Sequence, residues 1–174
     1  MEIIRKYLPN LVYGANDGII TTFAIVAGGF GAGLSSRVVL ILGFASLLAD
    51  GFSMATSNYL SERSRVQGEN MLGRRMAARH GSATLIGFVF PGMVPLIAYM
   101  LPIVPFLQFP IAVVLTLLTL FAIGAGRAAV VPSPWWRTGL EMLLIGAVAA
   151  AVAYGIGMVG GAFFNEGEFL AVAG

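Results

Sequence analysis

The chain has 174 residues, of which 58% are hydrophobic and only 10% are charged. Because water-soluble domains carry about 25% charged residues, this composition excludes an ordinary soluble domain and indicates an integral membrane protein. Cysteine is absent and histidine occurs once, which excludes disulfides, thiolate metal sites and His-rich metal sites. The formal net charge is only +2, and nothing in the charge pattern favours nucleic acid as a partner.

Basic residues separate five apolar segments, each long enough to cross the hydrocarbon core of a bilayer as a helix. The uncharged run from 81 to 126 is about twice the ~20 residues that one crossing needs, so two segments share it. We therefore predict an all-α fold with five transmembrane helices, in a single domain that covers residues 1–174. The predicted spans are residues 11–34, 38–60, 82–101, 110–130 and 139–161.

The placement of the basic residues predicts the orientation. Nine of the ten Lys and Arg residues lie before the first span, between the second and third, or between the fourth and fifth, and the exception is Arg37. Since cytosolic segments are enriched in Lys and Arg, we expect the N-terminus in the cytosol and the C-terminal end outside. The first span begins with polar residues and has membrane-crossing length, so we expect no cleavable signal peptide.

Proline and tryptophan mark further features of the spans. Pro91 and Pro95 lie inside the third span and should bend it. Other prolines place the outer turn of the hairpin between the third and fourth spans at residues 101–110. Trp135 and Trp136, just before the fifth span, are typical of residues that anchor a helix at the membrane interface.

Three acidic residues lie inside or at the edge of the spans, namely Asp17, Asp50 and Glu141, and no Lys or Arg lies deep in any span to pair with them. A charged Asp at the centre of a membrane helix costs about 2.5–3.5 kcal/mol on the insertion scale. Such a residue is protonated, solvated in a cavity, or matched by a mobile cation, and all three possibilities indicate a pathway for protons or cations. The structural alternative is a protonated acid that is hydrogen-bonded to a neighbouring helix. For Glu141, a position at the interface near Arg137 is the simpler alternative.

The second span carries a set of possible metal ligands. Asp50, Met54 and Asn58 follow one another at intervals of four residues, so they form a stripe along one helix face. Carboxylate and carbonyl oxygens suit hard cations, and a thioether shifts the preference toward softer transition metals. Taken alone, Met54 would be interpreted as a packing residue.

Three segments resemble the vacuolar iron transporter family. Residues 13–19 (YGANDGI) are similar to part of its first span, residues 48–55 (LADGFSMA) to its second, and residues 139–142 (GLEM) to the start of its fifth. The resemblance implies a homodimer of five-helix subunits, with a metal path between the first spans. It also implies export of Fe²⁺, and in some members Mn²⁺, from the cytosol in exchange for protons. The metal-contacting Asp and Met of the family correspond to Asp17 and Met54.

The sequence departs from the family pattern at two kinds of position. Plant and fungal members insert a Glu-rich cytosolic domain between the second and third spans, whereas residues 62–80 are few and rich in Arg here. Some members also carry acids two turns before the positions of Asp17 and Met54, where this chain has Asn10 and Ser46. Asp50 could substitute for the second of these acids.

The resulting prediction is a divalent-metal exporter with Fe²⁺ or Mn²⁺ as substrate and no permanently bound cofactor. Metal contacts are assigned to Asp17, Met54, Asp50 and Asn58, and proton coupling to Asp17, Asp50 and Glu141. The expected partners are metal ions, protons, the lipid bilayer and a second copy of the chain. With so short a segment between the second and third spans, a prokaryotic plasma membrane is favoured over a vacuolar or other organellar one.

Two other functional classes were weighed against transport. One is a membrane-embedded assembly protein whose intramembrane acids are structural. The other is an intramembrane enzyme, which the sequence disfavours because it contains no Gly-x-Ser-x-Gly or His-Glu-x-x-His motif and no cysteine. The one histidine, His80, is predicted to be a solvated residue of the basic loop that follows the second span.

Overall fold

The computed structural model describes residues 2–65, 71–129 and 132–163, and the side chains from Tyr7 onward. These residues form helices joined by short connections, with no strand among them. The helices are α1 (Glu2–Gly31), α2 (Ser36–Arg65), α3 (Met71–Gly92), α4 (Val94–Met100), α5 (Pro105–Arg127) and α6 (Trp135–Phe163).

Four of these helices are long and apolar enough to cross a membrane: α1 from Tyr7, α2, α5 and α6. Helices α3 and α4 are together long and apolar enough as well, with a bend of 40° at the break between them, and form a fifth candidate span. The prediction of an all-α membrane protein is confirmed. The helices reach beyond several of the expected spans, because hydropathy marks the part of a helix in lipid and not its continuation into water.

The bend between α3 and α4 lies where the sequence predicted it. Pro91 is in the last turn of α3, and Pro95 is near the start of α4. Proline supplies no backbone N–H and its ring crowds the preceding turn, which interrupts a helix. The outer turn is shorter than expected, because Pro105 begins α5 and Pro110 lies inside that helix. Proline fits the first turn of a helix, where an N–H would have no partner in the helix.

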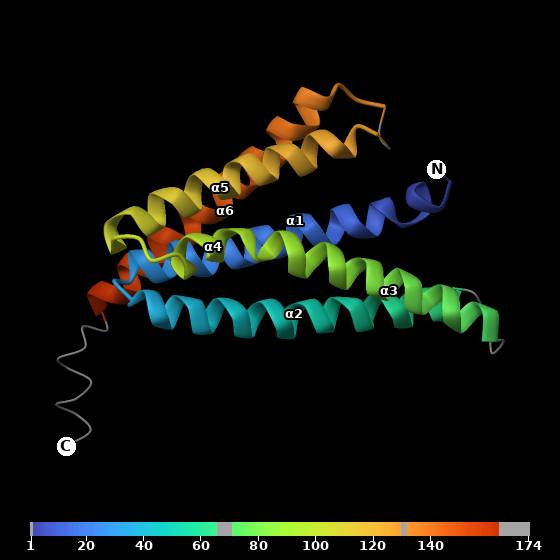
Figure 1. The fold of residues 1–174 in the computed structure, drawn as a ribbon, viewed down its shortest axis with the longest axis horizontal. Helices are drawn as coiled ribbons and strands as arrows, with labels where there is room; N and C mark the ends of the chain where they lie inside the picture. Colours follow the sequence, from blue (N-terminus) through green and yellow to red (C-terminus); the bar gives the residue numbers. More distant parts are fainter. Residues whose placement is uncertain (1, 66–70, 130–131, 164–174) are drawn as a thin grey trace, which may run out of the picture.

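Helix α1 is the centre of the bundle and packs against all five other helices. In Figure 1, α2 and α3 lie on one side of α1, and α5 and α6 on the other. Glycines allow the closest contacts: a Cβ on Gly18 would overlap the Phe88 backbone of α3, and one on Gly157 of α6 would overlap the Gly28 backbone of α1. Small residues that let helix backbones approach are the usual basis of packing in membranes.

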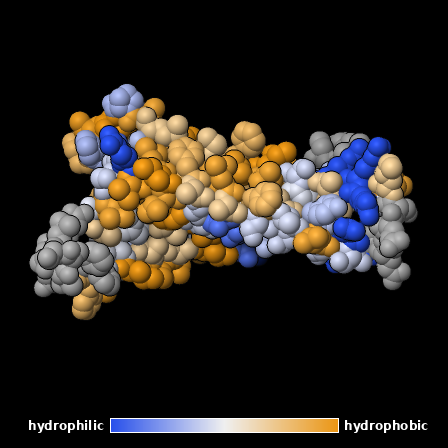
Figure 2. All heavy atoms as spheres, turned by 90° about the horizontal axis from the view of Figure 1, so that it is seen from below, coloured by the Kyte–Doolittle hydropathy of each residue, from blue (hydrophilic) through white to orange (hydrophobic). Residues whose placement is uncertain are grey.

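One end of the bundle is strongly basic. It is the end at which α2 finishes and α3 starts, and it is called the basic end below. There α2 and α3 reach further along the long axis than the end of α5 (Figure 1). Figure 2 shows hydrophobic residues over most of the molecule's length and hydrophilic ones gathered most densely at this end. The segment expected as a loop is largely helical, since α2 continues to Arg65 and α3 begins at Met71.

Candidate functional site

Two intramembrane acids lie near each other on neighbouring helices. Asp17 of α1 and Asp50 of α2 are both half-buried, and their carboxyls are close enough to interact electrostatically. Within residues 7–65, 71–129 and 132–163, neither carboxyl takes part in an ion pair. The packing of α1 on α2 therefore brings two acids together in lipid with no basic side chain among these residues to neutralise them.

Asp50 has a partner on its own helix. Ser46 donates a hydrogen bond from Oγ to Asp50 Oδ2 over 2.5 Å, one turn away. Ser46 occupies one of the positions where the sequence lacks an acid that some similar proteins carry. The hydroxyl holds one oxygen of the Asp50 carboxyl, so the second oxygen remains for another partner.

The other two residues of the α2 stripe follow toward the basic end. Met54 is half-buried one turn beyond Asp50. Asn58 donates a hydrogen bond from Nδ2 to Oγ1 of the fully buried Thr84 on α3, and Thr84 in turn donates to the His80 carbonyl over 3.1 Å. Since the nitrogen of the Asn58 amide is used in this way, its carbonyl oxygen is the atom left for a ligand.

A single copy of the chain offers few metal ligands at any one place. Among the described residues, no group of three or more His, Cys, Asp or Glu side chains could hold a metal ion. Asp17 and Asp50 contribute two carboxyls, and divalent cations take four or more ligands. A complete site would need Met54, amide oxygens, water, or the same residues of a second copy.

Glu141 does not belong to this pair of acids. It lies on α6, on the opposite side of α1 from α2 (Figure 1), and its Oε2 is 3.4 Å from Nη1 of Arg127. The expectation that no basic residue pairs with the intramembrane acids is therefore wrong for Glu141. The cause is topological, because α5 and α6 are consecutive, packed helices, so the end of one lies beside the start of the other.

The prediction for His80 is also wrong. His80 lies on α3 and is half-buried. Its Nδ1 is 2.6 Å from Asn10 Nδ2, and its ring centroid is 4.9 Å from that of Tyr7. This contact joins the basic ends of α1 and α3. Its two residues are 70 positions apart, so no local sequence signal could have indicated it.

The family model and the relatives that match this chain indicate the same protein family. A model of the VIT family matches residues 8–79 and 68–158. The vacuolar iron transporter of Toxoplasma gondii is 51% identical over 55 residues, which cover 32% of this chain and 18% of that protein. Vacuolar iron transporter 1 of Eucalyptus grandis is 26% identical over 216 aligned positions, which cover 89% of this chain and 85% of that protein.

The relatives differ in how much of their own length the match covers. A vacuolar iron transporter of Plasmodium berghei is 39% identical over 62 residues, but the match covers only 23% of its length. The chain thus spans less than a quarter of the two apicomplexan relatives and most of the plant relative. The alignment with the plant protein is longer than this whole chain, so that protein carries inserted residues that this chain lacks.

Proposed function

Because the chain belongs to the VIT family, we propose that it exports divalent transition-metal ions from the cytosol, with Fe²⁺ as the main cargo, Mn²⁺ as an alternative, and protons moving in exchange. The observation that carries this proposal is the proximity of Asp17 and Asp50. Repulsion between two neighbouring carboxylates in lipid is relieved by a bound cation or by protons. A site of this kind can therefore release a metal ion when it takes up protons, and the reverse.

The proposed metal site combines hard and soft ligands. Asp17 and Asp50 would provide carboxylate oxygens, Met54 a thioether sulfur and Asn58 an amide oxygen. Thioether ligands favour transition metals over Mg²⁺ and Ca²⁺, so Met54 would discriminate against the abundant hard cations. Ser46 would orient the Asp50 carboxyl through its hydrogen bond.

We further propose that the site is completed in a homodimer. Tyr13, one turn before Asp17 on α1, is 63% exposed, so the face of α1 that carries Asp17 is incompletely covered by the described residues. A second copy across this face would double the number of carboxyls and thioethers available to one ion. The scarcity of ligands in one copy supports this arrangement.

The proposed orientation places the basic end in the cytosol, as the positive-inside rule requires. The bend between α3 and α4 and the outer turn would then lie toward the other side. The short α2–α3 connection leaves no room for a separate metal-collecting domain, and we propose a prokaryotic plasma membrane as the location. The exposed ion pair of Glu141 gives that residue a weaker case as a proton carrier than Asp17 or Asp50.

Metal flux in proteoliposomes tests the proposal. Vesicles containing the purified protein, a metal-sensitive dye and a pH-sensitive dye would be exposed to Fe²⁺ or Mn²⁺ under a pH gradient set in each direction. We expect protons to move opposite to metal, and a loss of at least tenfold in metal flux for Asp17→Asn and Met54→Ala. Met100→Ala removes an exposed methionine of α4 and should keep the wild-type rate.

Two outcomes would contradict the proposal in different ways. Wild-type flux in Asp17→Asn would show that the site is wrongly assigned. The alternative of a membrane assembly protein would be favoured by the absence of metal flux at every pH gradient, together with a failure of Mn²⁺ to stabilise the folded wild-type protein.

A further inference from the structure

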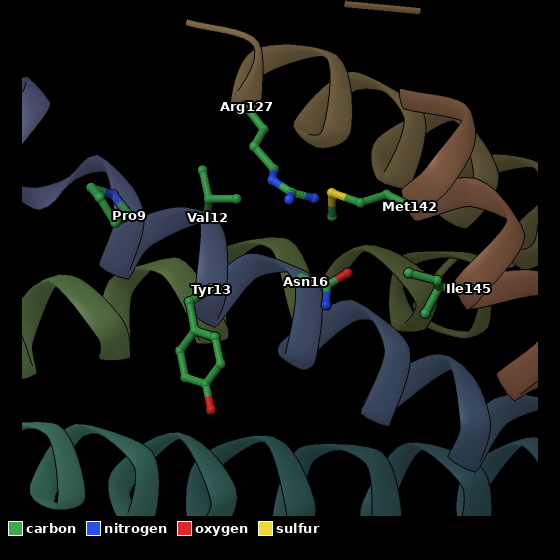
Figure 3. A pocket seen from close by; sticks show the side chains of 7 residues that line it. All are labelled: Pro9, Val12, Tyr13, Asn16, Arg127, Met142 and Ile145. Carbon is green, nitrogen blue, oxygen red and sulfur yellow. The ribbon is translucent and has the colours of Figure 1, made fainter. Parts of the chain in front are cut away.

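A cavity of about 340 Å³ lies between α1, α5 and α6, on the side of α1 away from Asp50. Figure 3 shows that Arg127 and Met142 reach into it from α5 and α6, and that the amide oxygen of Asn16 faces them from α1. Its volume falls in the range of about 300–1,000 Å³ typical of sites for small molecules. The lining residues are Pro9, Val12, Tyr13, Asn16, Arg127, Met142 and Ile145.

The polar groups of this cavity have unused hydrogen-bonding capacity. Asn16 Oδ1 is buried and accepts no hydrogen bond from the described part of the chain, although nearly all buried polar atoms in proteins are hydrogen-bonded. Arg127 has five N–H donors, and within the described part of the chain its guanidinium contacts only Glu141 Oε2, at 3.4 Å, which is longer than a strong charge-assisted bond. The cavity therefore has donors for an anion and an acceptor for a hydroxyl group.

The remainder of the cavity is apolar, and a second apolar cavity lies beside it. This neighbour, of about 350 Å³, lies between α1, α3 and α5 and shares Val12 with the first. At its rim, Ile86 and Phe90 of α3 are exposed, so it opens on the surface that faces lipid. Together the two cavities offer apolar space on both sides of the line where α1 approaches α5.

The cavity lies at the depth of the membrane interface. Arg127 is the last residue of α5, and α6 begins with the exposed Trp135 and Trp136. The guanidinium of Arg137 lies 5.1 Å above the ring of Trp136. Tryptophan and arginine at helix ends typically lie at the level of the lipid headgroups, so the polar part of the cavity is at headgroup depth and its apolar part is deeper.

We propose that this cavity binds an anionic phospholipid of the adjoining leaflet. The phosphate would accept hydrogen bonds from Arg127, a headgroup hydroxyl would donate to Asn16 Oδ1, and the acyl chains would fill the two apolar spaces. Basic pockets between transmembrane helices suit anionic headgroups. A choline headgroup is disfavoured, because it brings a cation toward the guanidinium and has no hydroxyl for Asn16.

The charge of Glu141 gives this proposal a sharp test. Its carboxylate competes with the lipid phosphate for Arg127, so the two neutralising substitutions should act in opposite directions. We expect Arg127→Gln to weaken binding of phosphatidylglycerol about tenfold or more, and Glu141→Gln to strengthen it severalfold. Arg137→Gln removes the same charge from the same membrane level but lies outside the cavity lining, and it should change the affinity less than twofold.

The experiment is a native mass-spectrometry titration of the delipidated protein in detergent with phosphatidylglycerol, phosphatidylcholine or glycerol 1-phosphate. Phosphatidylglycerol should bind with a defined stoichiometry and at least tenfold more tightly than either of the others. Arg127→Lys keeps the charge but loses the planar guanidinium with its paired N–H donors, so it should have an intermediate affinity. This variant replaces Arg127→Gln in the test if Arg127→Gln does not fold.

Three results would overturn the assignment: equal affinity of phosphatidylglycerol for wild type and Arg127→Gln, equal affinity of the wild type for phosphatidylcholine, or binding of glycerol 1-phosphate as tight as that of the lipid. The last result would indicate a site for a soluble anion. None of these readouts involves metal, so failure here leaves the proposed transport function untouched, and failure of transport leaves the lipid site untouched.

Discussion

Ser46 and Asp50 are joined by a hydrogen bond within α2, in which the serine hydroxyl donates to the carboxyl one turn further along. A neutral donor thus lies two turns before Met54. The hydroxyl gives no charge to the site but fixes the direction of the one carboxyl that α2 supplies. In the proposed metal site, this hydrogen bond would hold the Asp50 carboxyl in one orientation.

Ser46→Ala should therefore weaken metal handling without abolishing it. A hydrogen bond to a charged group contributes about 1.5–3 kcal/mol in favourable settings, and the half-buried position reduces this. We expect the metal concentration at half-maximal flux to rise roughly three- to tenfold, with little change in the maximal rate. The control is Ser61→Ala, at an exposed serine about two turns beyond Met54. Equal flux curves for the two variants would contradict the role of Ser46.

The surroundings of two glycines predict that replacing each with alanine has a different effect on stability. Gly18→Ala places a methyl group against the Phe88 backbone of α3, which cannot move aside easily, and should destabilise the protein by about 1–3 kcal/mol. Gly155→Ala on α6 meets nothing within 4 Å and should be neutral or slightly stabilising, because alanine favours helix more than glycine does. Unfolding in mixed detergent micelles measures both.

Asn10 and His80 should be energetically coupled. Their side chains are 2.6 Å apart and connect α1 to α3. In a double-mutant cycle of Asn10→Ala and His80→Ala, we expect a coupling energy of about 0.5–1.5 kcal/mol. Unfolding free energies of the wild type and three variants give this value directly. Additive effects would mean that the contact adds nothing to stability.

Metal binding should stabilise the folded protein in a way that depends on Asp17. A ligand at one hundred times its dissociation constant contributes about 2.7 kcal/mol, so Mn²⁺ at saturating concentration should raise the Tm of the wild type by about 5 °C or more. Asp17→Asn should remove this response, whereas Glu62→Gln, at an acid that pairs with Arg65 at the end of α2, should retain it. Thermal unfolding with increasing Mn²⁺ tests the assignment separately from transport.

The features that follow from local sequence were predictable. Membrane-crossing segments are long and apolar, so the helical bundle can be read from the sequence, and the prolines at 91 and 95 predict the bend between α3 and α4. The stripe of Asp50, Met54 and Asn58 follows from the helical period. The proximity of Asp17 to Asp50 requires that α1 pack against α2, and neither helix alone carries that information.

Features that depend on how separate helices meet were not predictable. The contact of His80 with Asn10 and the ion pair of Glu141 with Arg127 arise from the packing of α3 on α1 and of α6 on α5. The cavity around Asn16 has the same origin. The continuation of α2 and α3 beyond the membrane escaped prediction as well, since hydropathy falls where a helix enters water although its hydrogen bonds continue.

Helix α1 contacts the backbone of α3 near its own middle, at Gly18, and the backbone of α6 near its C-terminal end, where Gly157 approaches Gly28. Because these two contacts are made with different helices, α1 cannot slide along its axis or rotate about one contact without breaking the other. Asp17, beside Gly18, therefore lies next to one of these two close backbone contacts. In the proposed transport cycle, access to Asp17 from the two sides of the membrane would then change through movement of α2 relative to α1.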